Sequence, residues 1–372
     1  MRILEVILRP GLGGAETLVS GLVRAYRADG HSVDVVALDP PNSAQDRDAI
    51  EDRMDSVIPV ISQGFSRILP RQAARSVGMA RWLKSHRYDV VHAHSLIPNA
   101  YARIGAMLIT DAPPVVITLH SASRDFTSRR ARWSERFLFR RAAAVVAVGR
   151  RGADEYRSLI PMLKSAVILI PNGVTASSSE PVYRASPRTF LALCRLTPGK
   201  GIDVLLEGFA EFRNGRADAR LLVAGPAPDA AYVSSLQGLS RRLAIDDCVS
   251  FVGPRSDVAL LLNEADVFVH ASFAEAHSIA LLEAAAAGLP IVCSDLSPVR
   301  ESLGRAPTYF PSGQPHELAM ALSRVCSQWP QAVASARALA PQVATRFSMD
   351  RCAAAYFTVL NSVVAARSTR DS

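Results

Sequence analysis

Short runs of apolar residues recur along the whole chain, and stretches with helical periodicity separate them. The runs are rich in Val, Ile and Leu and lack the alternation of a half-exposed strand, so we expect strands buried on both faces. Strands that alternate with helices form parallel sheets covered by helices. The predicted strands are Ile3–Leu8, Val33–Leu38, Val90–His92, Val115–Leu119, Ala144–Val148, Phe190–Cys194, Arg220–Ala224, Val249–Val252, Val267–His270 and Ile291–Ser294.

The pattern predicts two such sheets, one in each half of the chain. Residues 171–187 are rich in Ser, Pro and Gly and are predicted to be the linker. We therefore place one Rossmann-like domain at residues 1–180 and a second at residues 181–349. A final helix that begins at Asp350 is expected to pack back on the first domain (residues 350–372). Ligands of doubly wound sheets bind at the C-terminal ends of the strands, so the ligand-binding residues are expected there.

The composition is that of an ordinary globular protein, with 49% hydrophobic and 20% charged residues. The five cysteines are scattered and form no CxxC pair, which argues against a disulfide framework or a zinc site and favours a reducing compartment. The segment Met1–Leu8 is too short and too acidic for a signal peptide, and no apolar run reaches the ~18 residues of a membrane span. We expect a cytoplasmic protein.

The net charge of +8 lies entirely in the first half. Residues 1–185 carry 25 Lys and Arg against 17 Asp and Glu, whereas the remaining residues carry 17 of each. This asymmetry predicts different partners for the two halves.

Seven of these cations fall in an arginine-rich helix predicted within residues 124–141. Trp133 and Phe137 lie one turn apart, and the arginines spread over the other faces. Such a helix suits an anionic membrane surface or an acceptor phosphate; the alternative is an ordinary helix whose aromatic residues enter the core. No nucleic-acid recognition fold accompanies it, so we expect no nucleic-acid partner. The candidate contact residues are Arg124, Arg129, Arg130 and Trp133.

Residues 275–295 are the most informative stretch of the chain. They place Glu275 before a predicted helix, Glu283 inside it, and Gly288 and Pro290 at its end. A helix N-terminus that points out of a sheet offers N–H groups and partial positive charge, which suit a phosphate. Carboxylates beside it are able to accept hydrogen bonds from the hydroxyls of a sugar or ribose. The stretch predicts a site for phosphate and polyol together, as a sugar-nucleotide enzyme requires.

Two cations share the loop between a predicted strand and the predicted helix Ile202–Phe212. Arg195 is able to grip phosphate oxygens with two donors, and Lys200 supplies a mobile point charge. Solvated loop cations are the alternative. Their place at the C-terminal end of a buried strand favours phosphate binding.

A glycine loop follows the first strand and opens a helix. Gly13 and Gly14 let the backbone approach a ligand, and the helix dipole favours an anion there. A dinucleotide-binding fold is the rival, because Gly11 begins its fingerprint and Asp39 ends the second strand. Glu16, however, stands in place of the third glycine and would repel a pyrophosphate. A tight turn without a ligand is also open.

Three histidines lie on predicted strands. His120 ends a strand, where it is able to hydrogen-bond a sugar hydroxyl or move a proton. His92 and His94 share one side of another strand, but no cysteine or acidic third ligand appears beside them, so we expect no metal there. Asp46 and Asp48 form a DxD sequence of the kind that holds Mg²⁺; no strand leads into it, and a solvated surface is expected.

Together these motifs resemble the family 4 glycosyltransferases of the retaining GT-B class. The resemblance covers almost the whole chain, and the Glu-x7-Glu stretch and the Arg…Lys loop are its specific parts. The supporting matches are Gly-Gly-Ala-Glu, Ile-Pro-Asn-Gly-Val, Leu-Val-Ala-Gly and Val-Ser-Phe-Val-Gly. It implies an α/β fold of two Rossmann-like doubly wound parallel-sheet domains facing across a cleft. It also implies a hexosyltransferase whose first domain binds the acceptor and whose second domain binds the nucleotide sugar.

The resemblance also implies roles for particular residues. Glu275 would hold the transferred sugar, Glu283 the ribose, and His120 would lie beside the sugar. Backbone near Gly14 would contact the distal phosphate. The implied catalytic residues are His120, Arg195, Lys200 and Glu275, and the implied donor-binding residues are Gly13, Gly14, Arg195, Lys200, His277, Ser278, Ile279 and Glu283.

This sequence departs from the family pattern at two points. The usual Gly-Phe-Gly after the first glutamate is Ala-His-Ser at residues 276–278, and the usual Val-Gly-Arg is Leu-Cys-Arg at residues 193–195. The path of the loop after Glu275, and the choice of sugar, therefore do not follow from the resemblance.

The resemblance implies no DxD metal and no cofactor, and a nucleotide diphosphate sugar as donor, for which we expect a UDP- or GDP-sugar. The basic first half of the chain favours a glycan or lipid-linked acceptor of polysaccharide, lipopolysaccharide or glycolipid synthesis. From the composition and the arginine-rich helix we expect a cytoplasmic protein with peripheral contact at the inner face of the cell membrane.

Three other classes of protein remain as alternatives. A sugar-nucleotide epimerase of the same architecture would release its product without an acceptor. A non-catalytic sugar-nucleotide-binding subunit would bind the donor and transfer nothing. An NAD-dependent oxidoreductase is the third, and the glycine loop together with Asp39 supports it.

Overall fold

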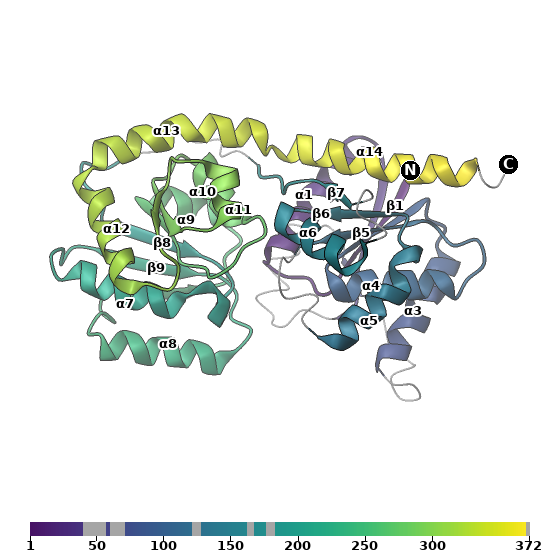
Figure 1. Cartoon of the computed structure of the whole chain (residues 1–372), viewed down its shortest axis with the longest axis horizontal. Helices are drawn as coiled ribbons and strands as arrows, with labels where there is room; N and C mark the ends of the chain where they lie inside the picture. The colour runs from purple at the N-terminus through teal and green to yellow at the C-terminus, as the bar shows by residue number, and fades with distance from the viewer. Residues whose placement is uncertain (40–56, 60–70, 121–127, 162–166, 176–182, 370–372) are drawn as a thin grey trace. The chain divides into compact units, whose positions relative to one another are not determined.

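The computed structural model describes residues 1–39, 57–59, 71–120, 128–161, 167–175 and 183–369. Two parallel sheets organise these residues, one in each half of the chain (Figure 1). The chain divides into a first unit (Met1–Gly11, Ala15–Gly173 and Met349–Ser372) and a second unit (Leu12–Gly14 and Val174–Ser348).

Within the described residues, the first sheet has seven parallel strands in the order β3-β2-β1-β4-β5-β6-β7. The chain starts at the inner strand β1, adds β2 and β3 on one side and then β4 to β7 on the other, as in a Rossmann fold. Its strands are β1 (Arg2–Ile7), β2 (Ser32–Ala37), β3 (Val57–Pro59), β4 (Val90–His94), β5 (Val115–Leu119), β6 (Ala144–Ala147) and β7 (Val167–Leu169). The helices of the first unit are α1 (Gly14–Ala28), α3 (Arg71–Ser85), α4 (Leu96–Met107), α5 (Arg129–Leu138), α6 (Arg150–Leu159) and α14 (Met349–Ser368), with a 3-10 turn at Phe139–Arg141.

The second sheet has six parallel strands in the order β10-β9-β8-β11-β12-β13. Its strands are β8 (Thr189–Leu193), β9 (Arg220–Ala224), β10 (Val249–Gly253), β11 (Val267–His270), β12 (Ile291–Ser294) and β13 (Thr308–Phe310). The helices of the second unit are α7 (Ile202–Arg213), α8 (Ala230–Arg242), α9 (Val258–Glu264), α10 (Ile279–Ala286), α11 (Ser297–Leu303), α12 (Pro315–Ser327) and α13 (Trp329–Arg346), with the 3-10 turn η3 at Pro198–Lys200.

The predicted α/β fold with two doubly wound parallel sheets is confirmed. All ten predicted strands are present, four of them with the predicted bounds. Strands β4 and β5 are buried at every position, as continuous apolar runs require. Three strands were not predicted, namely β3, β7 and β13. Each has three residues and lies at the edge of its sheet, so its apolar run is too short to stand out.

The final helix, α14, belongs to the first unit. Tyr356 on this helix is fully buried, and its ring lies 5.1 Å from the ring of His92 on β4. At the far end of the helix, Arg367 forms an ion pair with Asp111. Among the described residues, no helix is both long and apolar enough to cross a membrane.

Candidate active site

The loop that carries Lys200 is pressed against the end of β11 in the second unit. Gly201 follows the turn η3 with φ 62°, a conformation that favours glycine. A Cβ atom at this position would lie 2.2 Å from the carbonyl oxygen of Ala271, the residue after β11. Glycine is therefore required for both reasons, and the close approach brings Lys200 to the residues that follow β11.

Lys200 and Glu275 form the centre of a polar cluster. The Nζ atom of Lys200 donates to Oε1 of Glu275 at 2.5 Å, and His270 Nε2 lies 3.0 Å from the same oxygen. The hydroxyl oxygen of Ser272 lies 3.2 Å from His270 Nε2. The side chain of Glu275 is 10% exposed and that of Lys200 is 27% exposed, so the pair is reachable from solvent. We call these four residues the Lys200 cluster.

Electrostatics keep Glu275 ionised. Burial alone would raise its pKa, but the hydrogen bond and charge of His270 and the nearby Lys200 outweigh burial and lower the pKa to about 2. An ionised Glu275 accepts hydrogen bonds and donates none. The cluster therefore presents a fixed carboxylate beside a cation at physiological pH.

His270 and Ser272 were not predicted as site residues. His270 ends β11 just as His120 follows β5, so its strand-terminal position was an available signal. It is buried, and within the part of the chain that the structure describes its Nδ1 atom has no hydrogen-bond partner.

Helix α10 lies after Glu275, contains Glu283 and ends before Gly288, as the sequence predicts. Ser278 is its N-cap, and the Ser278 hydroxyl accepts a hydrogen bond from the backbone N–H of Leu281. At the other end Gly288 has φ 76°, and the N–H groups of Gly288 and Leu289 donate to the carbonyls of Ala285 and Ala284. These two bonds form a Schellman motif, which stops the helix before β12. Ile279 is therefore the first helical residue.

His277 precedes the cap and is held by an aromatic contact. Its ring lies edge-on to Phe347, with centroids 5.1 Å apart. Burial lowers the pKa of His277 to about 4, and the charge of Arg346 contributes. Glu283 lies half-buried on α10, inside the second unit.

Arg195 follows β8 on the same loop as Lys200, but its side chain is exposed. The structure thus brings Lys200 and Glu275 together, and the contacts of the Lys200 cluster do not include Arg195. The chain before Arg195 is tightly packed, because Gly225 has φ 136° and a Cβ atom there would lie 1.9 Å from the carbonyl oxygen of Cys194.

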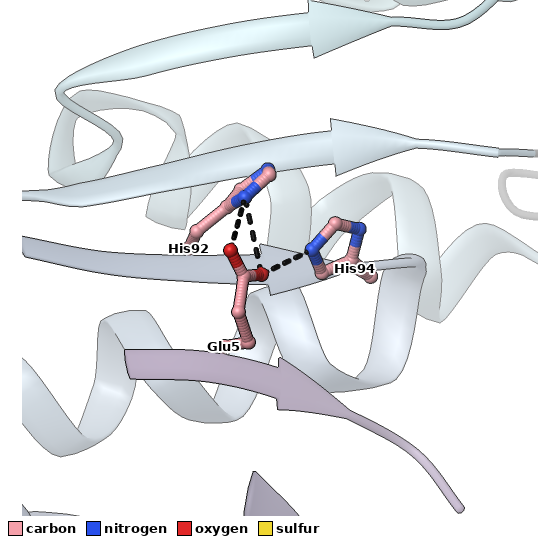
Figure 2. Close-up of side chains that lie close together, drawn as sticks. All are labelled: Glu5, His92 and His94. Atoms are coloured by element: carbon pink, nitrogen blue, oxygen red, sulfur yellow. Dashed lines mark hydrogen bonds and ion pairs between the residues drawn. The ribbon is translucent and has the colours of Figure 1, made fainter. Parts of the chain in front are cut away.

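In the first unit, His120 is the last member of a chain of polar side chains. His94 Nδ1 lies 3.0 Å from His120 Nε2, and His94 Nε2 lies 2.6 Å from Oε2 of Glu5. Figure 2 shows Glu5 between His92 and His94, with contacts to both rings. His92 Nε2 also lies 2.8 Å from the hydroxyl of Thr118.

The expectation that no acidic residue lies beside His92 and His94 is wrong. Glu5 lies on β1, whose register pairs Glu5 directly with His92 on β4. Glu5 is far away in the sequence, so no pattern along the chain connects it with the two histidines. Ligand atoms of these three residues lie within 4.8 Å of one another, close enough for a metal ion. All three side chains are buried, however, and both ring nitrogens of each histidine already have a protein partner.

The arginine-rich helix, α5, presents its aromatic residues to solvent. Trp133 is 72% exposed and Phe137 is 66% exposed, and their rings stack with centroids 6.4 Å apart. The alternative in which these rings enter the core is therefore wrong. Arg129 and Arg130 are exposed in the first turn of the same helix. Arg124 lies outside the described residues, as do Asp46 and Asp48 of the DxD sequence.

The glycine loop precedes α1, which begins at Gly14 directly after Gly13. Asp39, which ends the second strand, is buried and forms ion pairs with Arg9 and Arg75. A ribose-binding carboxylate of a dinucleotide fold would have to leave these arginines, so the geometry disfavours the NAD-dependent alternative.

Comparison with known proteins places these features in a family. The model described as Glycosyltransferase Family 4 matches residues 12–178, and the model described as Glycosyl transferases group 1 matches residues 187–328. A phosphatidyl-myo-inositol mannosyltransferase of Mycobacterium leprae is 30% identical over 327 residues, which cover 83% of each chain. The chain belongs to glycosyltransferase family 4. This confirms the resemblance seen in the sequence, and the protein is a transferase.

Other relatives of this glycosyltransferase agree on the fold and class. The alpha-monoglucosyldiacylglycerol synthase of Acholeplasma laidlawii is 26% identical over 317 residues, which cover 76% of this chain and 77% of the synthase. The crystal structure of Anabaena HepE in complex with UDP and glucose superposes with a TM-score of 0.83 at 20% identity, covering 97% of this chain and all of HepE. The fold is therefore GT-B.

Proposed function

We propose that this glycosyltransferase moves a hexose from a nucleoside diphosphate sugar to a hydroxyl of a glycan or lipid-linked acceptor, with retention of anomeric configuration. The observation that carries the proposal is the Lys200–Glu275 pair, in which Glu275 lies three residues before Ser278, the N-cap of α10. A cation and a helix N-terminus suit a diphosphate, and a carboxylate beside them suits a sugar.

The diphosphate is assigned to the second unit. Lys200 supplies a positive charge, and the exposed guanidinium of Arg195 on the same loop is able to donate two hydrogen bonds to a phosphate. The first N–H groups of α10 have no hydrogen-bond partners within the helix. Backbone at His277, Ser278 and Ile279 would cap the phosphate, and Gly13 and Gly14 would contact its distal end. The relative HepE has been solved with UDP and with UDP-glucose on the same fold, which supports a nucleotide-sugar donor of the UDP or GDP type.

The sugar and the ribose are assigned to carboxylates. Both contacts of Glu275 within the Lys200 cluster use Oε1, so we assign Oε2 to the hydroxyls of the transferred sugar. Glu283 would accept hydrogen bonds from the ribose. His120 would bind the sugar from the first unit.

The reaction follows from where charge develops. The bond between the anomeric carbon and the diphosphate oxygen breaks, and its electron pair stays on that oxygen. Lys200, Arg195 and the N-terminus of α10 stabilise the negative charge that forms there. The acceptor hydroxyl oxygen bonds to the anomeric carbon on the same face, and its proton passes to the departing phosphate oxygen.

The acceptor is assigned to the first unit, which carries the excess positive charge. The names of two relatives specify lipid acceptors or products, a phosphatidyl-myo-inositol and a glucosyldiacylglycerol. The exposed Trp133 and Phe137 between exposed arginines suit the interface of an anionic membrane. We therefore place the enzyme in polysaccharide, lipopolysaccharide or glycolipid synthesis, in the cytoplasm and peripherally at the inner face of the cell membrane.

An acceptor-dependence assay tests this function. Purified protein is incubated with UDP- and GDP-sugars, with and without a membrane lipid extract, and the release of nucleoside diphosphate is measured. Transfer predicts release that depends on the extract. Rearranged sugar without extract would indicate an epimerase, and binding without release under any condition would indicate a non-catalytic subunit.

The Lys200→Ala variant tests the mechanism in the same assay. Removal of one charge that stabilises the leaving group should lower kcat by about 10²-fold. The matched control is Lys84→Ala, which removes an exposed lysine from α3 in the first unit and should leave kcat unchanged. Full activity of Lys200→Ala would remove the proposed role of the Lys200 cluster.

A further inference from the structure

A continuous line of hydrogen bonds links His120 to a buried carboxylate in the first unit. Glu5 Oε2 lies 2.6 Å from His94 Nε2, and His94 Nδ1 lies 3.0 Å from His120 Nε2. Glu5 and His94 are almost completely buried, with exposed fractions of 0% and 1%. We call these three residues the Glu5–His94–His120 chain.

The protons of this chain can be assigned one by one, beginning at Glu5. Burial alone would raise the pKa of Glu5, but the charge and hydrogen bonds of His92 and His94 lower it to about 2. An ionised carboxylate only accepts hydrogen bonds. The proton between Glu5 and His94 therefore lies on His94 Nε2.

The second step fixes the other ring nitrogen of His94. Burial, with the charge of His92, lowers the pKa of His94 to about 4, so the ring is neutral at physiological pH and carries a single proton. Since that proton is on Nε2, Nδ1 has a lone pair and accepts. The proton between the two histidines must then lie on Nε2 of His120.

The third step gives the state of His120. Burial, and the repulsion from His94 and His92 when those rings are protonated, hold its pKa well below its usual value, so this ring is also neutral. A neutral imidazole with a proton on Nε2 has a lone pair on Nδ1. Nδ1 of His120 is thus a hydrogen-bond acceptor.

We propose that Glu5 and His94 are positioning residues that hold His120 as the neutral Nε2–H tautomer, so that Nδ1 of His120 accepts a hydrogen bond from a hydroxyl of the transferred sugar. This rests on the proposed function, because it assigns His120 to the sugar. The alternative tautomer would present an N–H to the sugar and could bond only to a hydroxyl lone pair.

The same geometry argues against a metal ion as the reason for this cluster. Each ring nitrogen of His92 and His94 has a protein partner at 2.6 to 3.2 Å, namely Glu5, Thr118 or His120. A metal ion would have to break two of these contacts in a buried site.

A histidine tautomer measurement tests the proposal directly. The full chain is labelled with ¹⁵N-histidine, two-bond ¹H–¹⁵N correlation spectra are recorded at pH 7, and the His120 signal is identified by its loss in His120→Gln. The wild-type protein should show His120 as neutral with its proton on Nε2. A proton on Nδ1 of His120, or a charged ring, would overturn the proposal without reference to activity.

Variants of Glu5 and His94 show whether the chain causes this state. Glu5→Gln removes the obligate acceptor, so both neutral tautomers of His120 should appear, and Glu5→Asp should restore the wild-type form. An unchanged His120 signal in folded Glu5→Gln would overturn the proposal. His94→Gln provides the same test if Glu5→Gln does not fold. Stoichiometric zinc found by elemental analysis in the wild type and lost in Glu5→Gln would also overturn it.

Kinetics separate positioning from a merely structural role. One weakened hydrogen bond to the sugar should lower kcat/KM of Glu5→Gln by about 3- to 10-fold. The affinity for the nucleoside diphosphate, which lacks the sugar, should not change, and Glu5→Asp should recover most of kcat/KM. Equal losses in both quantities would contradict positioning. If the wild type shows the expected tautomer but transfers no sugar, the proposed function fails and the tautomer assignment stands.

Discussion

At the scale of single residues, a buried ion pair fixes the arginine-rich helix. Glu135 on α5 accepts two hydrogen bonds from Arg103 on α4, each at 2.7 Å, and a third at 2.6 Å from the hydroxyl of Tyr156 on α6. Arg103 is completely buried. Removal of one partner from such a pair leaves an uncompensated charge inside the protein.

We therefore predict that Glu135→Ala destabilises the protein by about 3–5 kcal/mol. The matched control is Glu155→Ala, which breaks a surface pair with Arg151 and should cost less than about 1 kcal/mol. Urea unfolding followed by circular dichroism measures both. Equal losses of unfolding free energy in the two variants would show that the Glu135–Arg103 pair stabilises the protein no more than a surface pair does.

His277 should make stability depend on pH. Its pKa is about 4 in the folded protein, below the usual value near 6.5, so the unfolded chain binds a proton first as the pH falls. Its contribution is complete above pH 6.5 and is lost as the pH falls towards 4. Between pH 7 and pH 5 the loss is at most about 2 kcal/mol.

The prediction is that His277→Gln reduces the fall in unfolding free energy between pH 7 and pH 5. Urea midpoints at the two pH values provide the measurement. The control is His316→Gln, which removes an exposed histidine from α12 and should leave the fall in place. If His277→Gln and the wild type lose equal free energy, the ring of His277 is not held neutral.

The sequence predicted the site residues that lie close to one another along the chain, and missed those that strand pairing brings together. Lys200, Glu275 and Ser278 could be placed because each stands next to the end of a strand or the start of a helix. Glu5 could not, because its neighbours on β4 depend on the register between β1 and β4. A sequence pattern states which face a side chain takes and not which residue of another strand lies opposite.

At the scale of elements, α7 and α12 pack closely in the second unit. Gly208 on α7 permits this contact, because a Cβ atom there would lie 2.6 Å from the backbone oxygen of Pro315 and 2.8 Å from Leu318 Cδ2. Replacement of a helical glycine by alanine normally stabilises a helix by about 1 kcal/mol. Here the backbone of the neighbouring helix opposes that gain.

We predict that Gly208→Ala lowers the unfolding temperature, because the two helices must move apart. Gly238→Ala on α8 is the matched control. Its Cβ would meet only Arg242 at 3.5 Å, so it should raise stability by about 0.5–1 kcal/mol. Differential scanning calorimetry of both variants measures the sign. A stabilising Gly208→Ala would show that α7 and α12 are not in contact at this point.

A helix or strand could be predicted from the sequence where local residues mark its beginning and its end. Helix α10 was predictable because its signals are local, a serine at the N-cap and a glycine followed by proline at the end. No helix was predicted at α13, and its internal proline, Pro341, is a residue that normally argues against a continuous helix. The three edge strands were too short for periodicity to reveal.

At the scale of the whole molecule, the excess positive charge lies in the first half of the chain, and α5 in that half presents two exposed aromatic residues. The helix α5 combines exposed Arg129 and Arg130 with the exposed rings of Trp133 and Phe137. Basic residues near an anionic surface contribute about 1 kcal/mol each to binding. The proposed membrane contact therefore predicts a measurable loss of vesicle binding when these arginines are removed.

The Arg129→Ala, Arg130→Ala double variant should bind anionic vesicles about 10- to 30-fold more weakly than the wild type. Sedimentation with vesicles that contain phosphatidylserine measures this. The control, Arg241→Ala with Arg242→Ala, removes the same charge from the end of α8 in the second unit and should not change binding. Equal binding of the α5 variant and the wild type would end the membrane proposal.

Calorimetric titration of the full chain with UDP, GDP and ADP is the sharpest test of the proposed function, because binding of the diphosphate precedes every other step. We predict that one of these ligands binds with a stoichiometry of one. We also predict that Lys200→Ala weakens this binding by about 10-fold or more, as expected for a lost charge-assisted hydrogen bond of about 1.5–3 kcal/mol. Absence of binding by all three ligands to correctly folded wild-type protein would contradict the proposed function.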